Sequence, residues 1–175
     1  MIFYTADPHF GHERIITLCS RPFSSAEEMN EALISRWNSV VGEEDDIYVL
    51  GDVMYRSKTP PDKILSRLSG KKHLIVGNHD EDRLDDPDFT RFFESIDNYL
   101  IIDDEGRKVV LFHYPILEWY GSYRGYYHVF GHIHNMDNDA QRIMLPNRMA
   151  FNAGADIWDF TPVTLDQMIE SKKSD

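Results

Sequence analysis

Short apolar runs that end in glycine and then a polar residue constrain the fold of this chain most strongly. They occupy residues 47–50, 74–76 and 127–130 and lead into Gly51-Asp52, Gly77-Asn78 and Gly131-His132, respectively. Apolar runs of this length are typical of buried strands, and glycine lets the backbone turn sharply where a strand ends. The pattern therefore predicts polar side chains at the carboxyl ends of strands, which is where open α/β sheets bind their ligands.

Strands and helices alternate in the first half of the sequence. The predicted order is a strand at 2–5, a helix from 25 to about 41, a strand at 47–50, a short helix after 60 that closes at Gly70, and a strand at 74–76. Ser25 and Glu28 have the spacing of a capping box at the start of the long helix. Alternation of this kind favours a parallel sheet covered by helices, and hence the α/β class.

The second half of the chain contains more strands. We predict strands at 99–102, 108–112 and 127–130, a hairpin of 142–145 with 148–151, and a last helix capped by Thr164 with Gln167. A length of 175 residues predicts one domain, residues 1–175. The residue pattern by itself leaves open whether the strands form a single mixed sheet or a sandwich of two sheets.

Charge and composition narrow the range of functions. The net charge of −12 argues against a broad, salt-dependent grip on extended duplex nucleic acid. We expect no membrane span and no signal peptide, because no long apolar stretch is present and the first strand begins at Ile2. Cys19 is the single cysteine, which favours a reducing, cytoplasmic setting.

Oxygen and imidazole ligands follow most of the predicted strands. The candidates are Asp7, His9, Asp52, Asn78, His113, His132 and His134. Donors of this kind suit divalent ions such as Mn, Fe or Zn. A pair of such ions can clamp both the attacking and the leaving oxygen of a phosphate ester. The set therefore predicts a site for two metal ions and points to phosphate ester hydrolysis.

The strings DPH, GD, GNHD, HYP and GHIH, in that order, resemble the calcineurin-like metallophosphoesterase superfamily. The resemblance extends from Asp7 to His134 and is strongest to small, single-domain bacterial or phage phosphoesterases that begin with a DxHFGH string. It implies a two-sheet α/β sandwich with flanking helices. It also implies that Asp7, His9 and His134 hold one ion, that Asn78, His113 and His132 hold the other, and that Asp52 bridges both.

The resemblance also implies a mechanism. A hydroxide that bridges the two metal ions, most often Mn but also Fe, Zn, Ni or Co, is the nucleophile, and His79 is the general acid for the leaving oxygen. Asp80 is expected to hydrogen-bond His79 and keep it charged. His12 and Arg124 are candidates for binding substrate phosphate, with an ordinary loop histidine and a surface arginine as the alternatives.

The expected substrate is a small or nucleotide-like phosphodiester. The aromatic residues between Tyr114 and Tyr127 can stack on a base, although packing is the more common role of such a cluster. The alternatives are a phosphomonoesterase or protein phosphatase, and a non-catalytic scaffold that keeps the fold. The complete ligand set and His79 argue against the scaffold. Either a monomer or a homodimer is compatible with the sequence.

Overall fold

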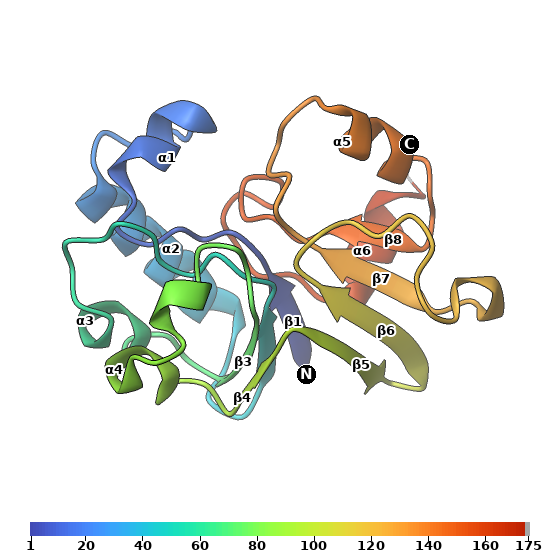
Figure 1. Cartoon of the computed structure of the whole chain (residues 1–175), viewed down its shortest axis with the longest axis horizontal. Helices are drawn as coiled ribbons and strands as arrows, with labels where there is room; N and C mark the ends of the chain where they lie inside the picture. Colours follow the sequence, from blue (N-terminus) through green and yellow to red (C-terminus); the bar gives the residue numbers. More distant parts are fainter. Residues whose placement is uncertain (174–175) are drawn as a thin grey trace.

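Two four-stranded sheets organise the protein in the computed structural model, which describes residues 1–173 (Figure 1). The first sheet is parallel and has the order β1 (Ile2–Thr5), β2 (Asp46–Val49), β3 (Lys71–Ile75) and β4 (Ser95–Asp97). The second has the order β5 (Tyr99–Asp104), β6 (Arg107–Phe112), β7 (Tyr127–Phe130) and β8 (Ala150–Asn152). Strands β5 and β6 are antiparallel, whereas β6, β7 and β8 are parallel. The structure thereby confirms the two-sheet α/β sandwich.

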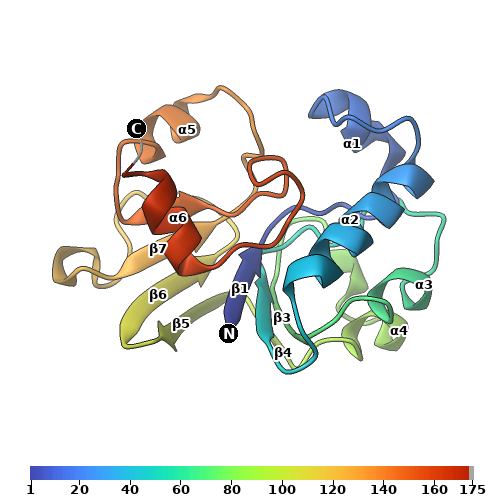
Figure 2. The ribbon, with the colours of Figure 1, turned by 180° about the vertical axis from the view of Figure 1, so that it is seen from behind.

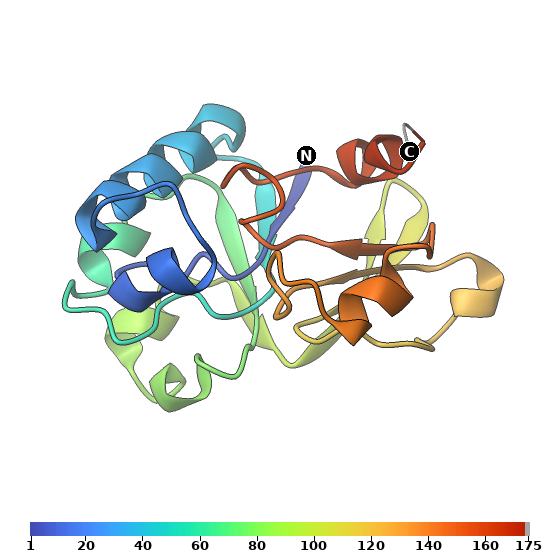
Figure 3. The same cartoon turned by 90° about the horizontal axis from the view of Figure 1, so that it is seen from above.

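Helices flank both sheets. Four of them lie on the side of the first sheet that faces away from the second: α1 (Glu13–Leu18), α2 (Ala26–Val40), α3 (Asp62–Leu65) and α4 (Pro87–Thr90) (Figures 1 and 3). The second sheet carries α5 (Asp139–Met144) and α6 (Leu165–Ser171), and Figure 2 shows α6 in front of it. Two short 3-10 helices, η1 (Glu81–Arg83) and η2 (Ser122–Arg124), lie in the loops. In the part of the chain described, no helix is both long and apolar enough to cross a membrane.

Alternate side chains of each strand face the layer between the two sheets. This layer is apolar because the side chains that face it are mostly hydrophobic. Tyr4 and Ile75 from the first sheet and Leu111 and Val129 from the second are fully buried there. Burying one such side chain contributes about 1.5–3 kcal/mol. The free edge of β1 also pairs with the chain after β8, through backbone hydrogen bonds between Tyr4 and Val163 of 2.8 and 3.0 Å. A further hydrogen bond of 2.9 Å, from the Ala6 N–H to the Ala153 carbonyl, brings the end of β1 beside the end of β8 in the second sheet.

Both predicted helix caps are present. The Ser25 hydroxyl accepts a hydrogen bond of 3.1 Å from the Glu28 N–H at the start of α2, although the Glu28 carboxylate bonds to Ser24 instead of completing the box. At α6, Thr164 and Gln167 form the full capping box. These caps are local, so the order of residues alone is sufficient to specify them.

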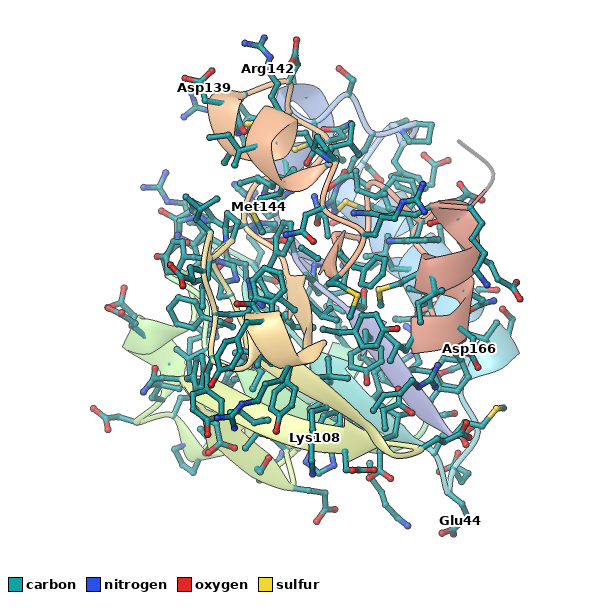
Figure 4. The ribbon with its side chains drawn as sticks, turned by 90° about the vertical axis from the view of Figure 1, so that its right-hand side faces the viewer. Glu44, Lys108, Asp139, Arg142, Met144 and Asp166 are labelled. Carbon is teal, nitrogen blue, oxygen red and sulfur yellow. The ribbon has the colours of Figure 1, made fainter. Side chains whose placement is uncertain are left out.

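The predicted hairpin of 142–145 with 148–151 is wrong. Residues 139–144 form α5, whose first turn is capped by the Asn138 side chain accepting from the Gln141 N–H. Met144 packs inward from this helix, whereas Asp139 and Arg142 point away from the core (Figure 4). Residues 150–152 pair in parallel with β7 rather than with 142–145. Ile143, Met144 and Leu145 form a short apolar run, which has no periodicity that separates a helix from a strand.

His128, a histidine outside the sequence motifs, has a structural role. It lies fully buried in β7, where Nδ1 donates to the Val110 carbonyl at 3.1 Å and Nε2 accepts from the Ile116 N–H at 3.1 Å. Burial lowers the pKa of this ring to about 4. His128 is therefore neutral and satisfied at neutral pH, and it holds the loop after β6 against the sheet.

Candidate metal centre

The carboxyl ends of strands from both sheets converge at the centre of the molecule, where the arrows of β1, β6 and β7 point in Figure 1. Asp7 and His9 follow β1, Asp52 follows β2 and Asn78 follows β3. From the second sheet, His113 follows β6, and His132 and His134 follow β7. The structure thus brings the candidate ligands of the two sheets together at one edge of the sandwich.

Most of these ligands have a left-handed backbone. The φ angles are 54° at Asp7, 51° at His9, 55° at Asp52, 69° at His132 and 49° at His134. This region is unfavourable for residues with a side chain, and each such residue costs about 1–3 kcal/mol unless the surrounding structure imposes it. Five of the ten described non-glycine residues with a positive φ are candidate ligands, and this share supports a functional site.

The glycines before the ligands allow a close approach of the backbone. A Cβ atom on Gly51 would lie 2.3 Å from His113 Nδ1, and one on Gly131 would lie 2.5 Å from Asp7 Oδ2. Any larger residue at either place would displace a ligand. Gly51 also has a φ of 86°, which residues other than glycine rarely adopt.

The first group of ligands contains buried atoms without a partner. One ligand atom each from Asp7, His9 and His134 lie within 4.8 Å of one another. Among the described residues, Asp7 Oδ1 and both ring nitrogens of His9 lack a hydrogen-bond partner. Burial raises the pKa of Asp7 to about 8 and lowers that of His9. Buried polar atoms are normally satisfied, and a cation that accepts these lone pairs fits the group.

The second group places acceptor atoms face to face. His113 Nδ1 donates to the Leu50 carbonyl at 2.7 Å, and burial lowers the pKa of this ring, so its Nε2 carries a lone pair. That lone pair faces Asn78 Oδ1 at 3.1 Å and Asp52 Oδ1 at 3.7 Å. His132 Nδ1 lies 3.0 Å from the same oxygen of Asn78. The lone pairs of His113 Nε2 and Asn78 Oδ1 face each other without a proton between them, and this arrangement fits a shared divalent cation.

Asp52 lies between the two groups. Its Oδ2 is 3.6 Å from His9 Nε2, while its Oδ1 is 3.7 Å from His113 Nε2. Both distances are too long for a hydrogen bond of normal geometry. They match the separation of about 3–4 Å between two ligands that each lie about 2 Å from one ion. The two oxygens of Asp52 therefore face different groups, as a bridging carboxylate does.

Asp156 and Arg21 orient the ligand His134, a role that the sequence did not indicate. Asp156 Oδ2 accepts from His134 Nδ1 at 2.9 Å, and Arg21 donates to both oxygens of Asp156 at 2.8 and 3.0 Å. Arg21 also donates to the carbonyls of Asp7 and Pro8 at 2.8 Å. Burial opposes charge on His134, but the hydrogen bond to Asp156 outweighs it and the pKa rises to about 10. Cys19, His134 and Asp156 also lie close enough to hold a cation. Arg21 already neutralises the charge of Asp156, which argues against a metal ion in this group.

We expect Asp156→Asn to lower metal affinity by about 10- to 100-fold, the usual effect of losing a partner that orients a histidine ligand. Calorimetric titration of Mn into the apoprotein measures this. The control is Asp166→Asn, which removes an exposed carboxylate paired with Arg107. A variant with a lower melting temperature but an unchanged Mn dissociation constant would assign Asp156 a purely structural role.

Asp80 is buried and has a different set of contacts from those expected. Its carboxylate accepts from the backbone N–H groups of Asp52 at 2.7 Å, Val53 at 2.9 Å and Gly77 at 2.9 Å. These bonds, and not the expected one to the His79 ring, are the contacts of the Asp80 side chain. Asp80 therefore ties the loop after β3 to the loop after β2, and these loops carry the candidate ligands Asn78 and Asp52.

His79 lies beside the first group of ligands. Its backbone N–H donates to Asp52 Oδ1 at 2.9 Å, and its ring stacks on Tyr55 with centroids 3.8 Å apart. The ring centroid of His9 is 5.7 Å away. A polar cavity of about 450 Å³ opens next to this ring, lined by Tyr55, Arg56, His79, Asp82, Arg83 and Asp86. Tyr55 was not predicted, although its place three residues after Asp52 was a signal for it.

Of the two candidate phosphate ligands, His12 reaches the site and Arg124 does not. His12 is buried between the rings of His9 and Tyr55, at centroid distances of 5.3 and 5.0 Å, and its Nδ1 has no partner among the described residues. Arg124 is exposed in η2, before β7 begins, and stacks on its neighbour Tyr123. The ligands follow the other end of β7, so the strand separates Arg124 from them.

Comparisons with known proteins agree with this geometry. Residues 1–142 match the family model of the calcineurin-like phosphoesterases. An uncharacterized protein of Methanocaldococcus jannaschii is 34% identical over 172 residues, which cover 97% of this chain and 89% of that protein. The gene 66 protein of Mycobacterium phage D29 is 25% identical over 188 residues, with 93% and 92% coverage. The crystal structure of a protein of unknown function from Aquifex aeolicus superposes with a TM-score of 0.76 at 25% identity, covering 98% of each chain.

The archaeal protein and the Aquifex structure are similar to this chain over nearly its whole length, so the likeness spans both sheets and the loops that follow their strands. The family match extends past His134, the last ligand in the sequence. This chain therefore belongs to the calcineurin-like phosphoesterase family.

Proposed function

We propose that this protein is a dinuclear metal-dependent phosphodiesterase that acts on small or nucleotide-like substrates. One observation carries the proposal: the two oxygens of Asp52 face imidazoles of different ligand groups, at 3.6 and 3.7 Å. A carboxylate between two clusters of lone pairs is the arrangement that a pair of cations requires. The family supports phosphoesterase chemistry in general, and the diester preference is our proposal.

The proposed first ion is held by Asp7, His9 and His134, and the second by Asn78, His113 and His132, with Asp52 shared. Mixed nitrogen and oxygen donors favour Mn and also accept Fe, Zn, Ni or Co. When bound, two divalent ions supply Lewis acidity to the phosphate ester and to the attacking water. Asn78 contributes a neutral oxygen, which leaves the site less negative than a third carboxylate would and so favours an anionic substrate.

His79 is the proposed general acid. Its ring is held by stacking on Tyr55, and its backbone is tied to Asp52, so it projects beside the ligand groups and toward the polar cavity. We propose that it gives a proton to the oxygen of the leaving group, which then departs into that cavity. His12, buried behind the same rings, is proposed to contact substrate phosphate or to support the ligand His9.

A phosphomonoesterase or protein phosphatase is the second candidate. Arg56 and Arg83 line the cavity beside His79, and a guanidinium binds two phosphate oxygens at once. A doubly charged monoester would gain more binding energy from these two arginines than a singly charged diester.

A cytoplasmic location belongs to the proposal as well, since one cysteine in a chain of this length favours a reducing compartment. The oligomeric state, monomer or homodimer, is part of the same proposal.

A substrate panel on chelated and Mn-reconstituted protein tests the proposed function. It compares bis(p-nitrophenyl) phosphate, p-nitrophenyl phosphate, and 2′,3′- and 3′,5′-cyclic nucleotides at equal concentrations. We expect turnover only after Mn is restored, and diesters to be cleaved faster than the monoester. Faster cleavage of the monoester would select the second candidate. Two bound metal ions with no turnover of any substrate would favour a non-catalytic scaffold.

A further inference from the structure

A row of aromatic rings extends from the second ligand group toward the edge of the second sheet. The Tyr114 ring lies 4.5 Å from that of His132, Phe112 lies 5.6 Å from Tyr114, and Tyr99 lies 6.1 Å from Phe112. Tyr114 follows β6, while Phe112 and Tyr99 are a cross-strand pair of β6 and β5. The row therefore runs across neighbouring strands at the same end of the sheet as the metal ligands.

Packing leaves part of each of these rings open to solvent. Trp119, in the loop after β6, is 4% exposed and donates to the Tyr126 carbonyl at 2.8 Å, so it is a core residue. Tyr114 and Tyr99, in contrast, keep 37% and 40% of their surface exposed, and Phe112 is partly exposed between them. Aromatic rings left open to solvent in a continuous row that begins at a candidate active site are suited to stack on flat ligands.

Tyr114 and His79 lie beside different ligand groups. His79 contacts His9 of the first group, whereas the Tyr114 ring contacts His113 and His132 of the second, and its hydroxyl lies 3.5 Å from Asn78 Oδ1. In the proposed reaction the leaving group departs on the His79 side. The row of aromatic rings is therefore on the side available to the part of the substrate that keeps the phosphate.

We propose that Tyr114, Phe112 and Tyr99 form a platform on which the bases of a short nucleotide diester stack, with the nucleoside that retains the phosphate on Tyr114. This inference rests on the proposed function, because it assigns the substrate class of the same site. Stacking on an aromatic ring tolerates any base, and alanine substitution of such a ring typically costs about 1–3 kcal/mol per base. The net charge of −12 favours a ligand of one or two nucleotides over a long strand.

The test compares two esters with the same leaving group. Thymidine 5′-(p-nitrophenyl phosphate) carries a base on the retained side, and methyl p-nitrophenyl phosphate does not. We expect the wild type to have a lower KM for the thymidine ester, and Tyr114→Ala to reduce this advantage by about 5- to 150-fold, which is the stacking energy converted to a ratio. Tyr114→Phe, which keeps the ring and loses the hydroxyl, should preserve it. Tyr123→Ala, at an exposed tyrosine in η2, is the control.

Tyr99 gives a second, length-dependent result. Tyr99→Ala should raise the KM for the p-nitrophenyl ester of a thymidine dinucleotide by the same factor, about 5- to 150-fold. It should leave the KM for the thymidine mononucleotide ester unchanged, because Tyr99 is proposed to stack only on the second base. Equal loss on both esters would mean that Tyr99 acts through the fold. The platform is overturned if the thymidine ester has no KM advantage, or if Tyr114→Phe loses it as fully as Tyr114→Ala.

Calorimetric binding of thymidine 5′-monophosphate, against inorganic phosphate, separates this inference from the proposed function. If no ester is hydrolysed but thymidine monophosphate binds more tightly than phosphate and loses this advantage in Tyr114→Ala, the platform stands and the proposed reaction fails. If metal-dependent hydrolysis occurs but thymidine monophosphate binds no better than phosphate, the proposed reaction stands and the platform fails.

Discussion

Asp52→Asn is expected to abolish metal-dependent turnover, with a loss on the order of 10³-fold or more, since metal ions contribute several kcal/mol to transition-state stabilisation. The substitution keeps the shape of the side chain. It also keeps an oxygen that can accept the hydrogen bond from the His79 N–H, which is 2.9 Å long in the wild type. It removes the negative charge and one of the two oxygens that face His9 and His113. The variant should therefore retain fewer than two ions per chain after dialysis, as measured by inductively coupled plasma mass spectrometry.

Asp104→Asn is the matched control for Asp52. Asp104 is also a buried carboxylate, but it lies at the far end of β5 and accepts a hydrogen bond of 2.8 Å from the Tyr4 hydroxyl. Its replacement changes stability and should leave metal content at the wild-type value. If Asp52→Asn bound two ions and turned over diesters like the wild type, the bridging role of Asp52 would be refuted.

His79→Ala is expected to keep both ions and to lose about 10²- to 10⁴-fold in turnover, the usual contribution of a general acid. His79 is not among the side chains that form the two ligand groups, so metal content should not change. The loss should depend on the leaving group. A p-nitrophenolate departs without a proton, whereas an alkoxide needs one, so an alkyl diester should suffer the larger loss.

His73→Ala provides the comparison for His79. The His73 ring lies in β3 with Ser95 Oγ at 3.0 Å and Asp46 Oδ1 at 3.1 Å, in contacts that do not involve the metal ligands. This variant should retain its turnover on both leaving groups. An equal loss on p-nitrophenyl and alkyl esters in His79→Ala would indicate that His79 positions the site through its stacking on Tyr55 and does not transfer the proton.

The candidate ligands could be predicted because each follows a strand whose apolar residues are visible in the sequence. Parallel strands place their carboxyl ends at the same edge of a sheet, so strand, glycine and ligand in succession imply convergence. The strands around Ile47, Leu74 and Val129 and the helix capped by Ser25 were recognisable for the same reason, since burial and capping leave local patterns. The choice of a sandwich over a single sheet came from the family resemblance and not from these patterns.

Short elements held by their neighbours were harder to predict. Strand β4 consists of Ser95–Asp97, which carry one apolar residue and pair with β3. Three residues show no periodicity, and the tertiary context decides their conformation. Residues 142–151 contain two short apolar runs around Pro146-Asn147, which do not by themselves separate a hairpin from a helix followed by a strand. The cap by Asn138 and the pairing of β8 on β7 determined the outcome.

By itself, the sequence determined the candidate metal ligands, the strands that deliver them and the family of the chain, because these depend on residue type and local order. The tertiary structure alone decided how the ligands are held and what surrounds them. Arg21 and Asp156 are 135 positions apart and meet behind His134. Asp80 bonds to the backbone of the loop after β2, and Tyr114 lies open beside His132. Such contacts join segments that are distant in the chain, and they arise only when the two sheets pack together.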